Sequence, residues 1–166
     1  MLKVGDIAPE IDAVTTDGSR FVLSEATGLC TIVYFYPKAF TPGCTAEAEH
    51  FRDNRAELLM AGAGIVGISA DDVQTQCRFA DKVGTRFPLI ADPDGAITRA
   101  YGVKWSILGL ARRVTFVIGP GRRVEAVFEH KSFVPFKPVD PLAFVDEVLA
   151  FVHRLQSESL LDPERF

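Results

Sequence analysis

The chain has 166 residues, of which 48% are hydrophobic and 24% are charged, and its formal net charge is −4. These values predict one globular domain with a buried core, and they argue against a nucleic-acid partner. No apolar run reaches the roughly 18 residues that a membrane span needs. The N-terminus has neither the basic start nor the apolar stretch of a signal peptide, so we expect a cytoplasmic, reducing setting.

The first half of the chain alternates between extended and helical patterns. Residues 1–30 form a lead-in with an Asp-Gly turn signal at residues 17–18. Residues 30–36 are β-branched and aromatic, which predicts a strand buried on both faces. The spacing of apolar side chains then predicts a helix over residues 42–61 and a second buried strand over residues 65–69.

The alternation continues beyond the second strand. Residues 70–84 are typical of a helix, with Ser69 or Asp71 near its N-cap. A short strand is expected over residues 87–92, and a short helix over residues 94–103. We therefore expect a parallel arrangement of strands in this part of the fold.

The last third predicts a β-hairpin and a closing helix. Residues 113–119 and 122–130 flank a Gly-Pro-Gly turn, and residues 141–155 form an amphipathic helix. We expect one domain over residues 1–156 and a loose tail over residues 157–166. The fold class is α/β, with a central mixed sheet covered by helices on both faces.

The cysteines do not form a recognisable framework. Cys30, Cys44 and Cys77 are too few and too scattered for a disulfide scaffold, and they include no C-x-x-C pair. A metal site formed by Cys44 and His50 would match no common ligand spacing, so we expect neither a metal nor a cofactor.

Cys44 lies where a strand gives way to a helix. Thr41 suits the helix N-cap and Pro42 the first helical position, which places Cys44 third in the helix. Backbone N–H groups and the helix dipole favour a thiolate there, and Gly43 lets the backbone approach the site. The alternative is a small buried hydrophobic residue, which is what most lone cysteines are.

The string YPKAFTPGCTAEA resembles the active-site segment of the peroxiredoxins, in which Thr or Ser follows Pro after three residues and Cys follows after two more. Its TPGCT-x-E-A form is similar to the peroxiredoxin Q branch, also called bacterioferritin comigratory proteins. VGDIAPEI, GISADD, FPLIADPDG, YGV and RRVTFVI follow the family's order, so the resemblance extends to about residue 150.

The resemblance implies a thioredoxin-like fold and a thiol peroxidase that reduces hydrogen peroxide and organic hydroperoxides through a cysteine sulfenic acid. Cys44 matches the nucleophile, and Thr41 the residue that hydrogen-bonds the thiolate and the peroxide. Pro37 matches the residue that shields the pocket. Arg113, in the R-x-T-F segment, matches the residue that stabilises the thiolate and the leaving oxygen. Glu47 matches an acidic residue that we expect to orient Arg113.

Other readings of these charged residues remain open. The alternative for Arg113 is an ordinary surface arginine. Because alternate residues of a strand face opposite sides, we expect its neighbour Arg112 to be the surface residue. Glu47 remains open to the reading of a solvated helix residue. We expect only surface or packing roles for three further residues: His50, His130 and His153.

The sequence departs from the family at the resolving cysteine, the thiol that captures the sulfenic acid. Many members carry it five residues after the first cysteine, where this chain has Glu49. Others carry it on the next helix, at a position that aligns with Ala80, one turn after Cys77. We favour a Cys44–Cys77 disulfide narrowly over a one-cysteine mechanism, and we expect Cys30 to be a buried packing residue.

The expected partners are a hydroperoxide and a thiol reductant: thioredoxin, glutaredoxin or a low-molecular-weight thiol. We expect no membrane or nucleic-acid partner, and a monomer or weak homodimer. The apolar residues 104–111 are expected to pack on the core or, alternatively, to form a pocket wall or dimer contact. Two competing functions are a non-catalytic redox sensor or binding protein and a glutathione peroxidase-like enzyme, which carries a different cysteine motif.

Overall fold

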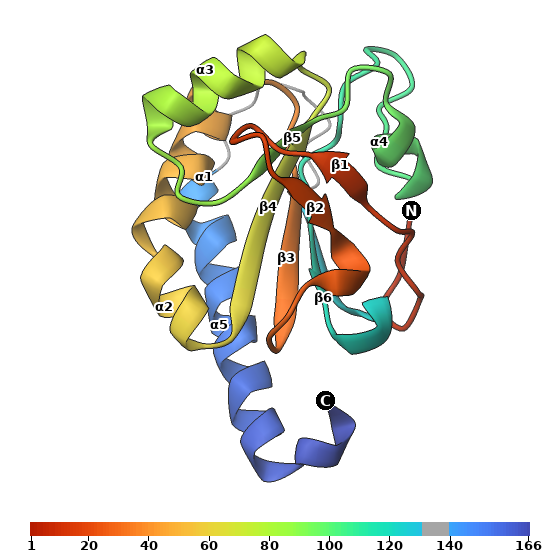
Figure 1. The fold of residues 1–166 in the computed structure, drawn as a ribbon, viewed down its shortest axis with the longest axis vertical. Coiled ribbons are helices and arrows are strands. Elements are labelled where there is room, and N and C mark those ends of the chain that lie inside the picture. Colours follow the sequence, from red (N-terminus) through yellow and green to blue (C-terminus); the bar gives the residue numbers. More distant parts are fainter. Residues whose placement is uncertain (131–139) are drawn as a thin grey trace.

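The computed structural model describes residues 1–130 and 140–166. At its centre is a five-stranded sheet of order β5-β4-β3-β6-β7 (Figure 1). Its strands are β3 Cys30–Phe35, β4 Ala63–Ser69, β5 Leu89–Ala91, β6 Val114–Ile118 and β7 Val124–Glu129. β3, β4 and β5 are parallel, whereas β6 and β7 are antiparallel to their neighbours. This is the mixed sheet that the sequence predicts.

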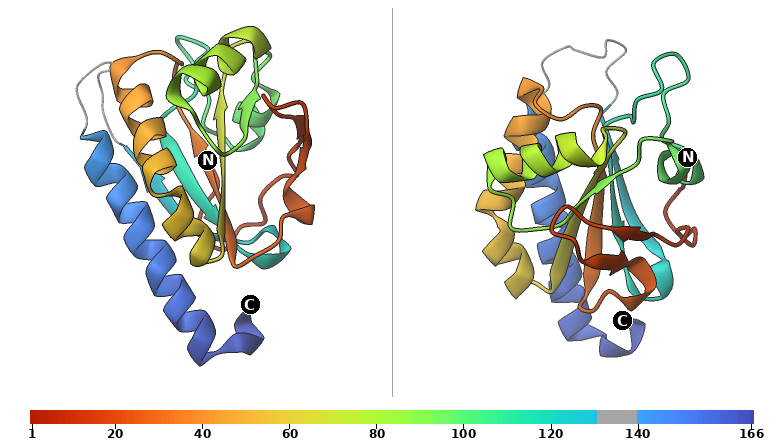
Figure 2. Two further views of the ribbon diagram at one scale, coloured as in Figure 1. Left: turned by 60° about the vertical axis from the view of Figure 1, so that its left-hand side comes forward. Right: turned by 45° about the horizontal axis from the view of Figure 1, so that its top comes forward.

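Helices and a small hairpin cover the two faces of the sheet (Figures 1 and 2). One face carries α1 Pro42–Asp53, α2 Arg55–Met60, α3 Val73–Val83 and α5 Pro141–Leu161. The other carries α4 Ala96–Ala100 and the hairpin of β1 Asp12–Val14 and β2 Arg20–Val22. Each crossover between parallel strands contains a helix, as is usual for such connections, and the fold class is α/β.

β3 is buried on both sides, as its composition predicts. Ile32 and Tyr34 belong to the apolar cluster beneath α1 and α5, and Val33 and Phe35 belong to the cluster on the opposite face. All four are 0% exposed, so the strand that leads to Cys44 is fixed by packing on both sides. A fixed strand end is a suitable base for a reactive loop.

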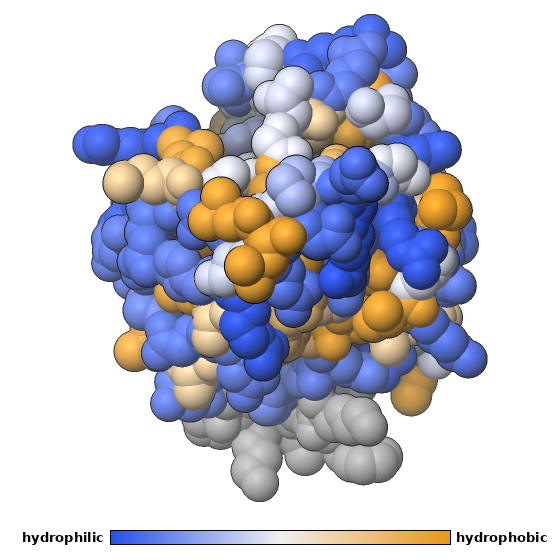
Figure 3. Space-filling model, turned by 90° about the horizontal axis from the view of Figure 1, so that it is seen from below, coloured by the Kyte–Doolittle hydropathy of each residue, from blue (hydrophilic) through white to orange (hydrophobic). Residues whose placement is uncertain are grey.

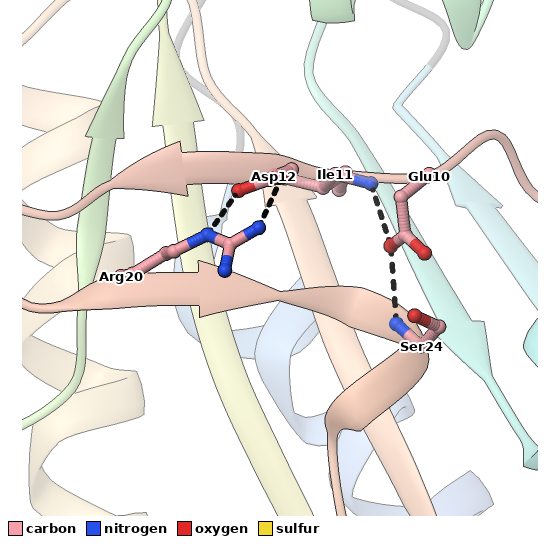
Figure 4. A network of polar contacts seen from close by, with 5 residues as sticks. All are labelled: Glu10, Ile11, Asp12, Arg20 and Ser24. Carbon is pink, nitrogen blue, oxygen red and sulfur yellow. Dashed lines mark hydrogen bonds and ion pairs between the residues drawn. The ribbon is translucent and has the colours of Figure 1, made fainter.

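Polar contacts hold the N-terminal hairpin (Figure 4). The Glu10 carboxylate accepts hydrogen bonds from the backbone N–H groups of Ile11 and Ser24, each at 3.0 Å. The Arg20 guanidinium donates to both oxygens of Asp12, at 2.7 and 2.6 Å. These contacts join the two strands of the hairpin and its following turn.

Several boundaries differ from the sequence prediction. The helix expected over residues 42–61 is divided into α1 and α2 at Asn54, whose side-chain amide donates to the His50 carbonyl at 2.9 Å. The N-cap of α3 is Asp72, which accepts from the Thr75 N–H and lies one residue after Asp71, which the sequence places near the cap. Capping requires a side-chain oxygen at the right backbone geometry, and adjacent acidic residues cannot be separated by pattern alone.

The apolar segment 104–111 packs on the core only at its boundaries. Val103 and Ala111 are 0% exposed, and Ala111 forms an isolated bridge with Lys104. Ile107 and Leu108, at the tip, are 84% and 48% exposed. The expectation of a core-packed loop is therefore wrong for the tip.

The C-terminal residues are ordered, which corrects the expectation of a loose tail over residues 157–166. α5 runs to Leu161, and a 3-10 turn follows over Pro163–Arg165. The Arg165 guanidinium pairs with Glu158 at 3.1 Å and with Glu125 at 3.7 Å, and Phe166 packs against the core. This end of the molecule projects beyond the sheet (Figure 1).

Surface histidines attach α5 to the neighbouring helices, as their expected packing role implies. His50 of α1 contacts Asp146 at 2.8 Å, and His153 contacts Glu57 of α2 at 2.6 Å. The face in Figure 3 shows separate apolar patches within a mostly hydrophilic surface. Among the described helices, none is long and apolar enough to cross a membrane.

Candidate active site

The connection between β3 and α1 carries the Cys44 thiol. β3 ends at Phe35, Thr41 is the N-cap residue of α1, and Pro42 begins the helix. Cys44 is therefore third in α1, and only 2% of it is exposed. A sulfur at this position lies near unpaired backbone N–H groups and the positive end of the helix dipole. The predicted helix start is confirmed.

The Thr41 hydroxyl adopts a different arrangement from an ordinary N-cap. It makes no capping bond to the helix, and its Oγ1 donates to the Lys38 carbonyl at 2.7 Å. A hydroxyl has one hydrogen, so only its lone pairs remain for further bonds. In this geometry Thr41 can accept from the O–H of a peroxide, whereas the expected donation to the sulfur is not made.

Arg113, which is distant from Cys44 in the sequence, contacts it in the fold. β6 runs antiparallel to β3, with Val114 opposite Phe35, so the start of one strand lies beside the end of the other. The Nη2 atom of Arg113 donates to the Cys44 Sγ at 3.2 Å. The arginine side chain is only 12% exposed, so solvent screens this contact weakly.

Glu47 lies on the other side of the same guanidinium. Its Oε1 is 3.0 Å from Arg113 Nη1, an ion pair that is not aligned as a hydrogen bond. Glu47 is 0% exposed, so the reading of a solvated helix residue is wrong. Burial raises the pKa of Glu47, and the charge of Arg113 opposes that shift. Burial acts to lower the pKa of Arg113, but Glu47 and Cys44 hold it above its ordinary value.

Gly43 leaves the space that Arg113 occupies. A Cβ atom on Gly43 would lie 3.3 Å from Arg113 Nη2, closer than most Cβ contacts in proteins. The same nitrogen donates to Cys44, so any side chain at residue 43 would press on the guanidinium. The glycine is therefore needed for close approach and not for an unusual backbone conformation.

The two neighbouring arginines contact different partners, although both precede β6, which begins at Val114 and not at residue 113 as the sequence predicts. Arg112 pairs with Glu129 of β7, and its side chain is 43% exposed. His130, for which the sequence predicts no part in the site, lies beside Arg113 and donates its backbone N–H to the Arg113 carbonyl at 3.2 Å. Partial burial and the Arg113 charge lower the pKa of His130.

The other two cysteines make no described hydrogen bond to Cys44 or Arg113. All three thiols are free, and the Cys77 Sγ donates to the Thr16 carbonyl at 3.6 Å. Ala80, one turn later, packs against the core cluster that includes Cys44. A Cys44–Cys77 disulfide would thus require local movement of one or both segments, and it stays a prediction. Burial raises the pKa of Cys30 to about 12, in keeping with its expected packing role.

Asp71 contacts the connection between β3 and Cys44, and the sequence does not predict this contact. Its Oδ2 accepts a 2.7 Å hydrogen bond from the N–H of Ala39, in the connection that leads to Cys44. The available signal is an acidic residue just beyond the carboxyl end of β4, the edge at which Cys44 also lies.

Pro37 is half-buried in the connection between β3 and α1, and its shielding role stays a prediction. Within residues 1–130 and 140–166, no cluster of three His, Cys, Asp or Glu side chains could hold a metal.

Comparison with known proteins points to one group. Residues 4–127 match the AhpC/TSA family. Peroxiredoxin Bcp of Escherichia coli K12 is 40% identical to this chain over 135 residues, which cover 77% of this chain and 86% of that protein.

Solved structures give the same result. Peroxidoxin BcpB of Mycobacterium tuberculosis superposes with a TM-score of 0.82 at 34% identity, covering 93% of this chain and 98% of that one. A bacterioferritin comigratory protein of Xanthomonas campestris, studied for alkyl peroxide reduction, gives a TM-score of 0.76 at 30% identity. That match covers 88% of this chain and 92% of the other. The expected thioredoxin-like fold and the peroxiredoxin Q resemblance are confirmed.

Proposed function

Because this chain belongs to the AhpC/TSA family and is a thiol peroxidase, we propose that Cys44 is the cysteine that attacks the peroxide. The observation that carries this assignment is the 3.2 Å contact between Arg113 and the Cys44 sulfur. A guanidinium next to a buried sulfur stabilises the thiolate, which is the nucleophilic form. Cys30 and Cys77 have no comparable charge partner among the described residues.

The reaction transfers two electrons from sulfur to the peroxide. The Cys44 thiolate attacks one peroxide oxygen in line with the O–O bond, and an S–O bond forms as the O–O bond breaks. The other oxygen leaves as hydroxide or alkoxide and takes up a proton, which gives water or an alcohol. Cys44 becomes a sulfenic acid. No metal or organic cofactor is needed for these steps.

The surrounding residues have distinct proposed roles. Arg113 stabilises the thiolate and then the charge that develops on the leaving oxygen. Thr41 accepts a hydrogen bond from the peroxide O–H and so orients the substrate. Glu47 fixes the guanidinium from behind, and Pro37 limits the access of water to the sulfur. The Xanthomonas relative, studied for alkyl peroxide reduction, supports organic hydroperoxides as substrates beside hydrogen peroxide.

The family requires a thiol to regenerate the enzyme. A thiol attacks the Cys44 sulfenic acid, forming a disulfide and releasing water. Two further thiol groups of the reductant then reduce that disulfide by exchange and are themselves oxidised to a disulfide. We propose that Cys77 is the first of these thiols and that thioredoxin, glutaredoxin or a low-molecular-weight thiol supplies the reducing equivalents. These reductants also suit the cytoplasmic setting that we propose.

Peroxide consumption by matched cysteine variants tests this proposal. With dithiothreitol as reductant, Cys44→Ser should show no consumption above the uncatalysed rate. Cys30→Ser should retain the wild-type rate, because its thiol is buried and its pKa is raised to about 12. A Cys44→Ser protein that still turns over peroxide at a comparable rate would overturn the assignment.

A further inference from the structure

The turn before α1 is held in a backbone conformation that its residues do not favour. Phe40 has a φ of 65°, in the left-handed region that a bulky side chain rarely occupies. Thr41, the next residue, donates its hydroxyl to the Lys38 carbonyl across this turn. The direction of the Thr41 lone pairs therefore depends on a strained turn, which persists only if other contacts hold it.

Asp71 makes the contact best suited to hold this turn. Its Oδ2 accepts the Ala39 N–H at 2.7 Å, and Ala39 is only 4% exposed. The same oxygen accepts the Ser69 hydroxyl at 2.7 Å, and Ser69 is fully buried at the end of β4. Hydrogen bonds to an ionised carboxylate are stronger than those between neutral groups. Asp71 thus ties the strained turn to the rigid centre of the sheet.

A second set of contacts comes from α3. The Phe40 ring packs against the Phe79 ring with centroids 5.4 Å apart, and the Lys82 amine lies 5.6 Å from the Phe40 centroid. These contacts act on the side chain and not on the backbone. Phe40 is also 42% exposed, so its ring is enclosed on one side only. Asp71 is therefore the residue that fixes the backbone of the turn, through the Ala39 N–H.

We propose that Asp71 is a positioning residue for the peroxidase reaction, which acts through the Ala39 N–H to set the direction of the Thr41 hydroxyl. The inference rests on the proposed roles of Cys44 and Thr41. Asp71 makes no described contact with Cys44 or Arg113, which hydrogen-bond each other directly. Loss of the carboxylate should therefore impair peroxide orientation and leave the contact between Arg113 and the Cys44 sulfur intact.

A double-mutant cycle with Thr41 tests this inference, with the second-order rate constant for hydrogen peroxide as the readout. We expect Asp71→Ala to lower it on the order of tenfold, because misplacement of an orienting group costs rate steeply. In protein that already carries Thr41→Val, adding Asp71→Ala should lower the rate constant by less than about twofold relative to Thr41→Val alone. The reason is that the effects of residues that act through one group are not additive. Asp71→Asn, which keeps the shape but not the charge, should fall between Asp71→Ala and the wild type.

Asp72→Ala is the matched control. It removes the neighbouring carboxylate and the α3 N-cap, so it should lower the melting temperature with little change in rate. The absorbance near 240 nm, which reports an ionised sulfur, should change with pH in Asp71→Ala as it does in the wild type. Independent, multiplicative effects of Asp71→Ala and Thr41→Val would overturn the inference, as would a different pH dependence of that absorbance or a wild-type rate in Asp71→Ala. If Asp71→Ala does not fold, Asp71→Asn is used in the same cycle. Failure of the proposed function itself would appear separately, as an active Cys44→Ser protein.

Discussion

Arg113 donates a hydrogen bond to the sulfur of Cys44 at 3.2 Å, although the two residues are 69 positions apart. The contact follows from topology. Cys44 lies in the first turn of the helix after β3, and Arg113 directly precedes the strand that runs antiparallel beside β3. The sheet therefore brings a cation to a helix N-terminus that already favours negative charge.

Replacing Arg113 should slow the reaction far more than replacing its neighbour. Arg113→Met removes the donor to the sulfur and to the leaving oxygen, and loss of one such donor typically costs on the order of 10²-fold in rate. Arg112→Met removes a half-exposed ion pair with Glu129 and should have little effect. Stopped-flow measurement with hydrogen peroxide compares the two. Equal effects would show that Arg112 and Arg113 do not have the separate roles proposed here.

Glu47→Gln should lower activity without lowering stability at neutral pH. The amide keeps the shape but no longer holds Arg113 by charge, so the rate constant should fall. Burial raises the pKa of Glu47 above its ordinary 4.5, so folding favours its protonated form. The stabilisation that comes from protonated Glu47 is therefore complete below the pKa that Glu47 has in the unfolded protein. It is lost as pH rises through the pKa that Glu47 has in the folded protein.

The free energy of unfolding of the wild type, relative to Glu47→Gln, should therefore decrease as pH rises above 4.5. Urea unfolding of both proteins at several pH values measures this difference, and Glu49→Gln, at an exposed position, is the matched control. A wild-type advantage that grows with pH would contradict the burial argument.

Gly43→Ala should disturb the site without distorting the backbone. The added methyl would lie 3.3 Å from Arg113 Nη2, so the guanidinium must move by a few tenths of an ångström. We expect the peroxide rate constant to fall several-fold and the melting temperature to change little, because small misplacements reduce rate more than stability. Stopped-flow kinetics and thermal unfolding measure the two effects. An unchanged rate constant would show that close approach of Arg113 at residue 43 is unnecessary.

Oxidation by one equivalent of peroxide should join Cys44 to Cys77. A disulfide requires Cα atoms within roughly 7 Å, so the first turn of α1 or the start of α3 must unwind locally. Non-reducing peptide mapping detects the bond, and Cys30→Ser serves as a control that should give the same map. A sulfenic acid or mixed disulfide on Cys44, with Cys77 still open to alkylation, would favour the one-cysteine mechanism.

The sequence predicts the central strands β3, β4 and β6 because they are buried on both faces and so carry nearly unbroken apolar runs. The start of α1 is also predictable, because Thr41, Pro42 and Cys44 suit successive positions of a helix N-terminus. The alternation of side chains along an extended strand also selects Arg113 over Arg112 from the sequence, although the structure places both residues just before β6. These features depend on local chemistry and on spacing.

The remaining features depend on contacts across the fold. Asp71 is two residues beyond β4, and only the packed structure brings it to the Ala39 N–H. The sequence pattern around Glu47 also suits a solvated helix residue. Only the packed structure shows that Glu47 is buried beside Arg113. The C-terminal residues show no strong pattern, yet Arg165 and Phe166 are held by contacts distant in sequence.

The most direct test of the account is the identity of the residue that peroxide oxidises first. Cys77→Ser protein, treated with one equivalent of hydrogen peroxide in the presence of dimedone, should carry the sulfenic acid adduct on Cys44 and none on Cys30. Mass spectrometry of the digested protein locates the adduct, and the same treatment of Arg113→Met should label Cys44 far more slowly. An unmodified Cys44 in protein that has consumed the peroxide would contradict the account.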